Sequence, residues 1–240
     1  MRTTVDYFTN RGSNVFAAFL DCSKGFDRVN HDGIFIKLIQ RGVPLCFLNL
    51  LIYWYKSLTS VVKWNDVYSF SFTVGSGVRQ GGVLSPHLFA IYVDDLILTL
   101  RRLNVGCHVL DIFLASLVYA GDICLMAPCR SSLQTLLDAC QSYGLSWCLT
   151  YNPPKSRIMQ FGKQEVKTQF TMYGNLLDFV NEYKYLGVIV VAGKHFSTSH
   201  THPLIKFRSA ANTVLNAHSK PSEDVLMKLL YATCVPPVFP

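Results

Sequence analysis

The sequence has few charged residues for its length. Only 15% of its 240 residues are Asp, Glu, Lys or Arg, whereas about a quarter are charged in an average globular protein. Half of the residues are hydrophobic, which is enough to fill a sizeable core in a chain of this length. This composition argues against an intrinsically disordered protein. It also indicates that a partner or further chain covers some apolar surface.

The sequence also has no run of about 20 uncharged apolar residues, which is the length needed to span a membrane. The best candidate, LDIFLASLVYAGDICLMA at 110–127, contains Asp111 and Asp122. The first 14 residues lack the apolar core of a signal peptide. We therefore expect no membrane association and a nuclear or cytoplasmic location.

The eight cysteines include no CxxC pair. Because no secretion signal is present, a disulfide framework is not expected. A zinc site that uses His195, His200 and His202 is the alternative. Most of the cysteines lie in apolar runs, which favours buried free thiols beside a solvated histidine loop.

The positive charge is concentrated near the end of the chain. Residues 1–150 hold 12 basic and 10 acidic side chains, while residues 151–240 hold 10 basic and 5 acidic ones. A basic segment of this kind suits contact with a polyanion such as nucleic acid. An ordinary solvated surface would have the same composition, so charge alone does not decide between the two.

The first half of the chain alternates between strand and helix patterns. VFAAFLD at 15–21 is a short apolar run of the kind that forms a buried strand. Helical periodicity follows at 31–41 and 45–57. The segment 61–78 then alternates apolar and polar residues about Asn65-Asp66, which predicts a hairpin.

The second half continues this alternation. Residues 131–143 place leucines on one helical stripe, with Gly144 as the expected C-terminal stop. RIMQFG, VKTQFTMYG and YKYLGVIVV are typical of strands. A helical pattern starts at Thr201 and is broken by Pro221. The irregular order predicts a mixed α+β sheet with helices on one face rather than a doubly wound parallel sheet.

Two segments that contain tyrosine and aspartate compete for the role of a catalytic turn. In LFAIYVDDLILTL, apolar residues recur every fourth position after Ser85-Pro86, a good N-cap followed by proline. Asp94 and Asp95 are therefore expected on the solvent face of a helix. A hairpin centred on this pair stays possible, because periodicity alone does not exclude it.

In SLVYAGDICLMA, the second of these segments, two apolar runs of strand length meet at a turn of small residues. This pattern predicts a hairpin with Asp122 at its tip. Gly121 is expected to serve as a turn residue that is free to adopt a positive φ.

Five segments in order along the chain closely resemble successive motifs of reverse transcriptases of the non-LTR (LINE-like) retrotransposon type. The resemblance extends from about Val15 to Ile189 and more loosely into the terminal helices. Any one motif would be a weak signal, whereas five in the right order make a strong one. The segments are FLDCSKGFDRVNHDGIFIKL, SGVRQGGVLSPHLFAIYVDDL, LVYAGDICLM, NPPKSRIMQFG and YKYLGVIV.

The resemblance implies a polymerase palm, which is a ferredoxin-like antiparallel sheet with helices on one face. The expected division is an N-terminal remnant at 1–14, a palm with partial fingers at 15–190, and the start of a helical thumb or connection at 191–240. In the family, carboxylates of the first motif and of a Tyr-x-Asp-Asp hairpin bind two Mg²⁺ ions. Two hard cations about 4 Å apart need several anionic oxygens on rigid strands.

Carried over to this chain, the resemblance makes Asp21 the first metal ligand. Asp122 matches the second aspartate of the hairpin. The first aspartate, usually the more direct ligand, falls on Gly121. Lys155 matches a lysine that protonates the leaving pyrophosphate, although a plain surface lysine accounts for it equally well.

Further positions match residues that contact the nucleotide or the template. Phe26 matches the aromatic gate that excludes a 2′-hydroxyl, with a core phenylalanine as the alternative. Gln80 matches the glutamine beside the incoming nucleotide, Gly81 allows close backbone approach, and Arg79 is a candidate contact for template phosphate. Asp27 is interpreted as structural, and YKYLGV resembles the segment that grips the primer.

The chain departs from the family by lacking the upstream finger segment, most of the thumb and an endonuclease domain. We therefore expect a fragment of a larger retrotransposon polyprotein. The predicted function is RNA-directed DNA polymerisation on an RNA template and DNA primer with deoxynucleoside triphosphates, impaired by Gly121. The alternative is a catalytically silent palm that binds nucleic acid. An unrelated α+β binding domain is disfavoured by the order of the motifs.

Overall fold

The computed structural model describes residues 1–163 and 169–199, together with the isolated positions 212, 225, 227–229 and 232. Most of the predicted helical region after Thr201, the break at Pro221, and the side chains of His200 and His202 lie outside the described residues. Within the described part, no helix is both long and apolar enough to cross a membrane.

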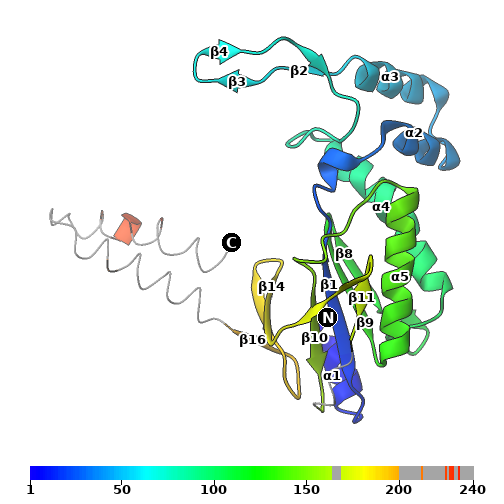
Figure 1. Ribbon diagram of the computed structural model, residues 1–240, viewed down its shortest axis with the longest axis vertical. Helices are drawn as coiled ribbons and strands as arrows, with labels where there is room; N and C mark the ends of the chain where they lie inside the picture. Colours follow the sequence, from blue (N-terminus) through cyan, green and yellow to red (C-terminus); the bar gives the residue numbers. More distant parts are fainter. Residues whose placement is uncertain (164–168, 200–211, 213–224, 226, 230–231, 233–240) are drawn as a thin grey trace.

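A five-stranded sheet forms the centre of the molecule, with the strand order β13-β10-β1-β9-β8 (Figure 1). Its pairs are antiparallel except for the short parallel pair of β10 and β13. Its strands are β1 (Val15–Asp21), β8 (Ser116–Tyr119), β9 (Asp122–Ala127), β10 (Arg157–Phe161) and β13 (Asp178–Phe179). This is the mixed α+β arrangement that the sequence predicts.

Strand β1 is buried on both faces of the sheet. Phe16, Ala18 and Leu20 belong to one core cluster, while the alternate side chains, including Ala17 and Phe19, belong to a second. A strand covered on both sides reads as a continuous apolar run, which explains the pattern of VFAAFLD. Because β1 is also the middle strand, its last residue lies at the centre of one sheet edge.

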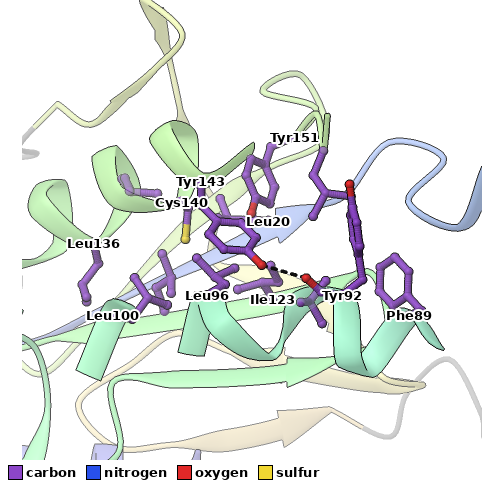
Figure 2. Packing of buried hydrophobic residues seen from close by; sticks show 14 of the residues in the cluster. Leu20, Phe89, Tyr92, Leu96, Leu100, Ile123, Leu136, Cys140, Tyr143 and Tyr151 are labelled. Atoms are coloured by element: carbon purple, nitrogen blue, oxygen red, sulfur yellow. Dashed lines mark hydrogen bonds between the residues drawn. The ribbon is translucent and has the colours of Figure 1, made fainter. Parts of the chain in front are cut away.

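Two long helices cover one face of the sheet, α4 (Ser85–Arg102) and α5 (Arg130–Ser146) (Figure 1). Figure 2 shows their interface, where Leu96 and Leu100 of α4 lie near Leu136 and Cys140 of α5. All four side chains are fully buried. The hydroxyl of Tyr143 donates to the backbone oxygen of Tyr92 across 2.7 Å (Figure 2), which ties the two helices together.

The opposite face is covered by α1 (Arg2–Thr9) and by a second sheet in the order β14-β15-β16. Its strands are β14 (Glu182–Tyr185), β15 (Val188–Val191) and β16 (Ser197–Ser199). Val5 of α1 packs into the second core cluster, and Phe19 stacks on Tyr183 with ring centroids 4.6 Å apart. The expectation that helices lie on one face is therefore right for the two long helices and wrong for α1.

A smaller region projects from one end of the central sheet (Figure 1). It contains the 3-10 turn η1 (Phe26–Arg28), α2 (His31–Gln40) and α3 (Leu45–Lys56). An arm follows, in which β2 (Thr59–Ser60) pairs with β5 (Phe72–Thr73) and β3 (Lys63–Trp64) pairs with β4 (Val67–Tyr68). The hairpin predicted about Asn65-Asp66 is confirmed.

Two further hairpins are short and lie outside the central sheet. One joins β6 (His108–Val109) to β7 (Ile112–Phe113). The other joins β11 (Thr171–Met172) to β12 (Asn175–Leu176), and α5 packs against β11.

Two predicted helix boundaries are wrong for identifiable reasons. Gly144 does not end α5, which continues to Ser146. A side chain at this position would collide with the backbone oxygen of Leu149 and crowd Tyr151, so the glycine serves close packing. Ser85 is the first residue of α4 and not its N-cap, because its hydroxyl donates to the backbone oxygen of Arg79.

Candidate active site

Two carboxylates lie side by side at the edge of the central sheet. Asp21 is the last residue of β1 and Asp122 is the first residue of β9, and the two are direct partners in the antiparallel register. The backbone nitrogen of Cys22 donates to the backbone oxygen of Gly121 across 3.2 Å. The turn between β8 and β9 is thus fixed to the end of β1, and the hairpin predicted here is confirmed.

The charges around this pair are unbalanced. Loss of hydration, and next the negative charge of Asp21, raise the pKa of Asp122 above its ordinary value. The Lys155 ammonium lies 4.0 Å from Asp21 Oδ2, and its side chain is 70% exposed. Two carboxylates that oppose each other's ionisation favour a bound cation between them.

Gly121 occupies the turn without needing the conformational freedom of glycine. The left-handed residue of this turn is Ala120, with φ of 49°, while Gly121 is not in the positive-φ region. The expectation that Gly121 supplies a positive φ is therefore wrong. A Cβ built on it would lie 3.6 Å from Cys22 Cβ and 3.8 Å from the Cys22 backbone oxygen, which are ordinary contacts. Neither the backbone nor the space at this position excludes a side chain.

The carboxylate oxygens at this edge could hold one divalent cation more readily than two. Asp21 and Asp122 supply hard carboxylate oxygens of the kind that Mg²⁺ prefers. Among residues 1–163 and 169–199, no group of three or more His, Cys, Asp or Glu side chains is placed to hold a metal. A pair of ions in one site needs more anionic oxygens than two carboxylates provide.

Phe26 lies beside the same hairpin. Its ring stacks on that of Phe89, with centroids 4.5 Å apart and an interplanar angle of 13°. Phe26 and Ala120 both line a largely apolar cavity of about 420 Å³ against α4. The structure thus places the predicted gate residue next to the turn that precedes Asp122, with its ring held by an aromatic neighbour.

The segment predicted to bind the nucleotide, which contains Gln80 and Gly81, lines a second cavity together with Phe26. This cavity has a volume of about 610 Å³. Arg79 is exposed and borders a separate cavity of about 480 Å³ that also includes Gln80. Phe26, Gln80 and Gly81 are therefore brought together, whereas Arg79 lies on the side of Gln80 toward the arm.

Asp94 and Asp95 lie in the middle of α4, as predicted, and take no part in the sheet-edge pair. They are not simply solvated, however, because Asp95 binds Lys37 of α2 and Asp94 binds Arg41, the C-cap residue of that helix. Lys37 Nζ is 2.5 Å from Asp95 Oδ2, and Arg41 Nη2 is 2.6 Å from Asp94 Oδ2. Sequence reasoning missed this contact. The available signal was a single lysine within the apolar run IFIKLI.

The segment YKYLGVIV forms the β14–β15 hairpin, with Leu186 and Gly187 at positive φ in its turn. Tyr183 and Tyr185 both pack on Phe19. Burial raises the pKa of both phenols. These tyrosines are therefore packing residues between the two sheets.

The cysteines and histidines give no support to a second metal site within the described residues. The seven described cysteines are free thiols. The expectation that they are buried is wrong for Cys46, Cys129 and Cys148, which are exposed. His195 is described but belongs to no group of potential ligands there.

Comparison with known proteins assigns a family to this arrangement. The family described as Reverse transcriptase (RNA-dependent DNA polymerase) matches residues 1–190. The RNA-directed DNA polymerase from mobile element jockey of Drosophila funebris is 29% identical over 233 residues, which cover 93% of this chain and 25% of that protein. A retrotransposable-element Pol polyprotein of Nasonia vitripennis is 30% identical over 189 residues, or 73% of this chain and 18% of the relative.

Solved structures agree on the fold. The structure of apo telomerase from Candida tropicalis superimposes with a TM-score of 0.64 over 98% of this chain and 38% of that one, at 12% sequence identity. At this identity the likeness shows the fold alone. The chain spans about a quarter or less of the curated relatives named above.

Proposed function

Because the chain belongs to the reverse transcriptase family, as a partial domain of the non-LTR retrotransposon type, we propose that it is built for RNA-directed DNA polymerisation. Its substrates would be an RNA template, a DNA primer and deoxynucleoside triphosphates. The observation that carries this proposal is the pairing of Asp21 with Asp122 at the ends of adjacent strands. Residues 15–190 would form the palm and partial fingers, and 191–240 the start of a thumb within a larger polyprotein.

Asp21 and Asp122 are the residues that would hold Mg²⁺. When bound, such ions activate the primer 3′-hydroxyl and offset the charge of the triphosphate. The raised pKa of Asp122 supports this role, because loss of hydration and next the neighbouring Asp21 carboxylate both disfavour its ionised form, and a bound cation would offset these effects. The sheet register holds both carboxylates on rigid strands, which an ordered site requires.

The remaining proposed roles belong to residues around this edge. The stacked ring of Phe26 would close the space beside the sugar of the incoming nucleotide and so exclude a 2′-hydroxyl. Gln80 and Gly81 would line the nucleotide on the facing side, and Arg79 would contact template phosphate. Lys155 would hold a proton near Asp21 and deliver it to the pyrophosphate as that group leaves.

Gly121 is proposed to impair this activity. It leaves two carboxylates where the family pattern has three, so a pair of bound ions would carry a large uncompensated positive charge. Removing one preorganised electrostatic partner from an active site lowers the rate by a factor of about 10²–10³. Loss of a ligand shared by two ions is expected to lower the rate by at least as much. This missing ligand is the observation that favours the second candidate, a catalytically silent palm that binds nucleic acid.

Binding of nucleic acid is expected of both candidates. The six described basic residues after position 150 are Lys155, Arg157, Lys163, Lys184, Lys194 and Lys228. We expect the logarithm of the primer–template binding constant to fall steeply and linearly with the logarithm of salt concentration. Salt-independent binding, or none at low salt by a folded sample, would contradict a nucleic-acid groove.

Primer extension separates the enzyme from the silent palm. The natural chain and its Gly121→Asp variant would be compared with Mg²⁺ or Mn²⁺, with the upstream finger segment supplied from a related element. We expect extension by the aspartate form and little by the glycine form. Equal extension by both would show that Asp21 and Asp122 suffice. Failure of both in a well-folded sample would show that the loss of activity lies elsewhere.

A further inference from the structure

The Asp27 carboxylate binds the side chain that is proposed to contact the incoming nucleotide. Gln80 Nε2 donates to Asp27 Oδ1 across 3.0 Å. We propose that Asp27 is a positioning residue, which fixes the orientation of the Gln80 amide for nucleotide binding. This inference rests on the proposed function, and it replaces the interpretation of Asp27 as only structural.

The backbone holds Asp27 and Gln80 in place independently of their side chains. The backbone nitrogens of Gly77 and Val78 donate to the backbone oxygens of Val29 and Phe26, each across 2.8 Å. A Cβ at Gly77, whose φ is +90°, would lie 2.8 Å from the Asp27 backbone oxygen, so this close approach requires glycine. The two segments are therefore bound along their length, and the carboxylate is presented to the amide by a fixed frame.

The chemistry of the pair fixes which way the amide faces. An ionised carboxylate only accepts hydrogen bonds, so it must meet the NH₂ end of the glutamine. This leaves Gln80 Oε1 and one N–H to face a ligand. A partner that both donates and accepts, or no partner at all, would allow the amide to rotate between two orientations.

The position of the pair connects it to the site. Asp27 lines the cavity of about 480 Å³ next to the arm, and Phe26 lines the cavity of about 610 Å³ next to the hairpin. Gln80 borders both cavities. Asp27 thus binds Gln80 on the side of the arm, while Phe26 lines the cavity on the side of the hairpin. These two consecutive residues of one turn therefore border the two cavities that meet at Gln80.

Both side chains are exposed, so their hydrogen bond adds little to the stability of the fold. Removing it is expected to leave the protein folded and to act on binding instead. This makes a double-mutant cycle practicable with Asp27→Ala, Gln80→Ala and the combined variant. Asp66→Ala, in the exposed turn of the arm, removes the same charge and serves as the matched control.

Two measurements on the full chain decide the question. The first is the affinity for a deoxynucleoside triphosphate added with Ca²⁺ to a preformed primer–template complex. We expect it to fall about tenfold in Asp27→Ala and in Gln80→Ala, and no further when the two are combined. Affinity for the primer–template alone, and both affinities in Asp66→Ala, should stay within about twofold of the natural chain.

The second measurement is the NMR signal of the Gln80 side-chain NH₂ group in the free protein, which needs no nucleotide. We expect two proton signals that are displaced from those of a free glutamine amide in the natural chain and that move to the free-amide positions in Asp27→Ala. Unchanged signals would overturn the positioning role, as would full nucleotide affinity in Asp27→Ala or a further loss in the combined variant. If the natural chain binds no triphosphate, the proposed function fails at that step, and the role of Asp27 in nucleotide binding fails with it.

Discussion

Lys37 and Asp95 form an ion pair in which the two partners differ sharply in exposure, and this difference predicts unequal costs of mutation. The side chain of Lys37 is 1% exposed and that of Asp95 is 36% exposed. Lys37 Nζ also donates to Tyr143 Oη across 2.8 Å and lies 3.9 Å from the centre of the Trp147 ring. Burial lowers the pKa of Lys37, which the Asp95 carboxylate only partly offsets.

The magnitudes follow from what each mutation leaves behind. Asp95→Ala strands a buried ammonium, which is expected to cost about 3–5 kcal/mol in the free energy of unfolding. Lys37→Met leaves a carboxylate that water and Arg41 can still reach, 3.7 Å away. Its expected cost is about 1–2 kcal/mol. Adding Lys37→Met to Asp95→Ala should recover about 2 kcal/mol, because it removes the stranded charge.

Urea unfolding at pH 7 of the three variants and the natural chain provides the assay. Asp94→Ala is the matched control, since its pair with Arg41 is largely exposed and is worth less than about 1 kcal/mol. The loss in free energy of unfolding caused by Asp95→Ala should also become smaller as pH rises, because the unpaired Lys37 can then release its proton. Equal costs for Lys37→Met and Asp95→Ala, or a larger cost for Lys37→Met, would refute the reasoning.

Two further predictions concern stability. Burial raises the pKa of Cys107 and Cys124 to about 12. The unfolded chain releases these protons from about pH 9 upward, whereas the folded protein retains them. The free energy of unfolding should therefore fall as pH rises, by about 2 kcal/mol per thiol near pH 10.5. Urea midpoints that stay constant or rise between pH 8 and about pH 10.5 would contradict this burial. Gly144→Ala should destabilise the protein by about 1–3 kcal/mol because the added methyl meets the Leu149 backbone oxygen, and unchanged thermal unfolding would show that this close approach relaxes freely.

The sequence patterns predicted the central strands and helix α4 correctly, because in these elements the spacing of apolar residues matches the side chains that the fold buries. VFAAFLD is apolar throughout and is covered on both faces. The Asp122 hairpin was identifiable because two apolar runs of strand length meet at small residues. The helical assignment of Asp94 and Asp95 succeeded because the spacing of apolar residues in α4 matches its buried face.

Two of the missed contacts join segments far apart in the sequence, whereas the error at Gly144 is local. The helical pattern around Gly144 does not indicate that Leu149 and Tyr151, a few residues further along the chain, turn back and pack against it. The burial of Lys37 depends on α4 and α5, more than 50 residues away along the chain. Likewise, the bond between Asp27 and Gln80 spans 53 residues and joins two motifs whose adjacency only the fold reveals.

The most direct test of the central claim is to count the divalent ions bound at the sheet edge. Mn²⁺ would be titrated into the natural chain and into Gly121→Asp, with Asp21→Asn as the control that removes a remaining ligand. If Asp21 and Asp122 form a centre that lacks one carboxylate, the natural chain should bind at most one ion and Gly121→Asp should bind two. Asp21→Asn should bind none at comparable concentration. Two ions bound by the natural chain as tightly as by Gly121→Asp would contradict the claim.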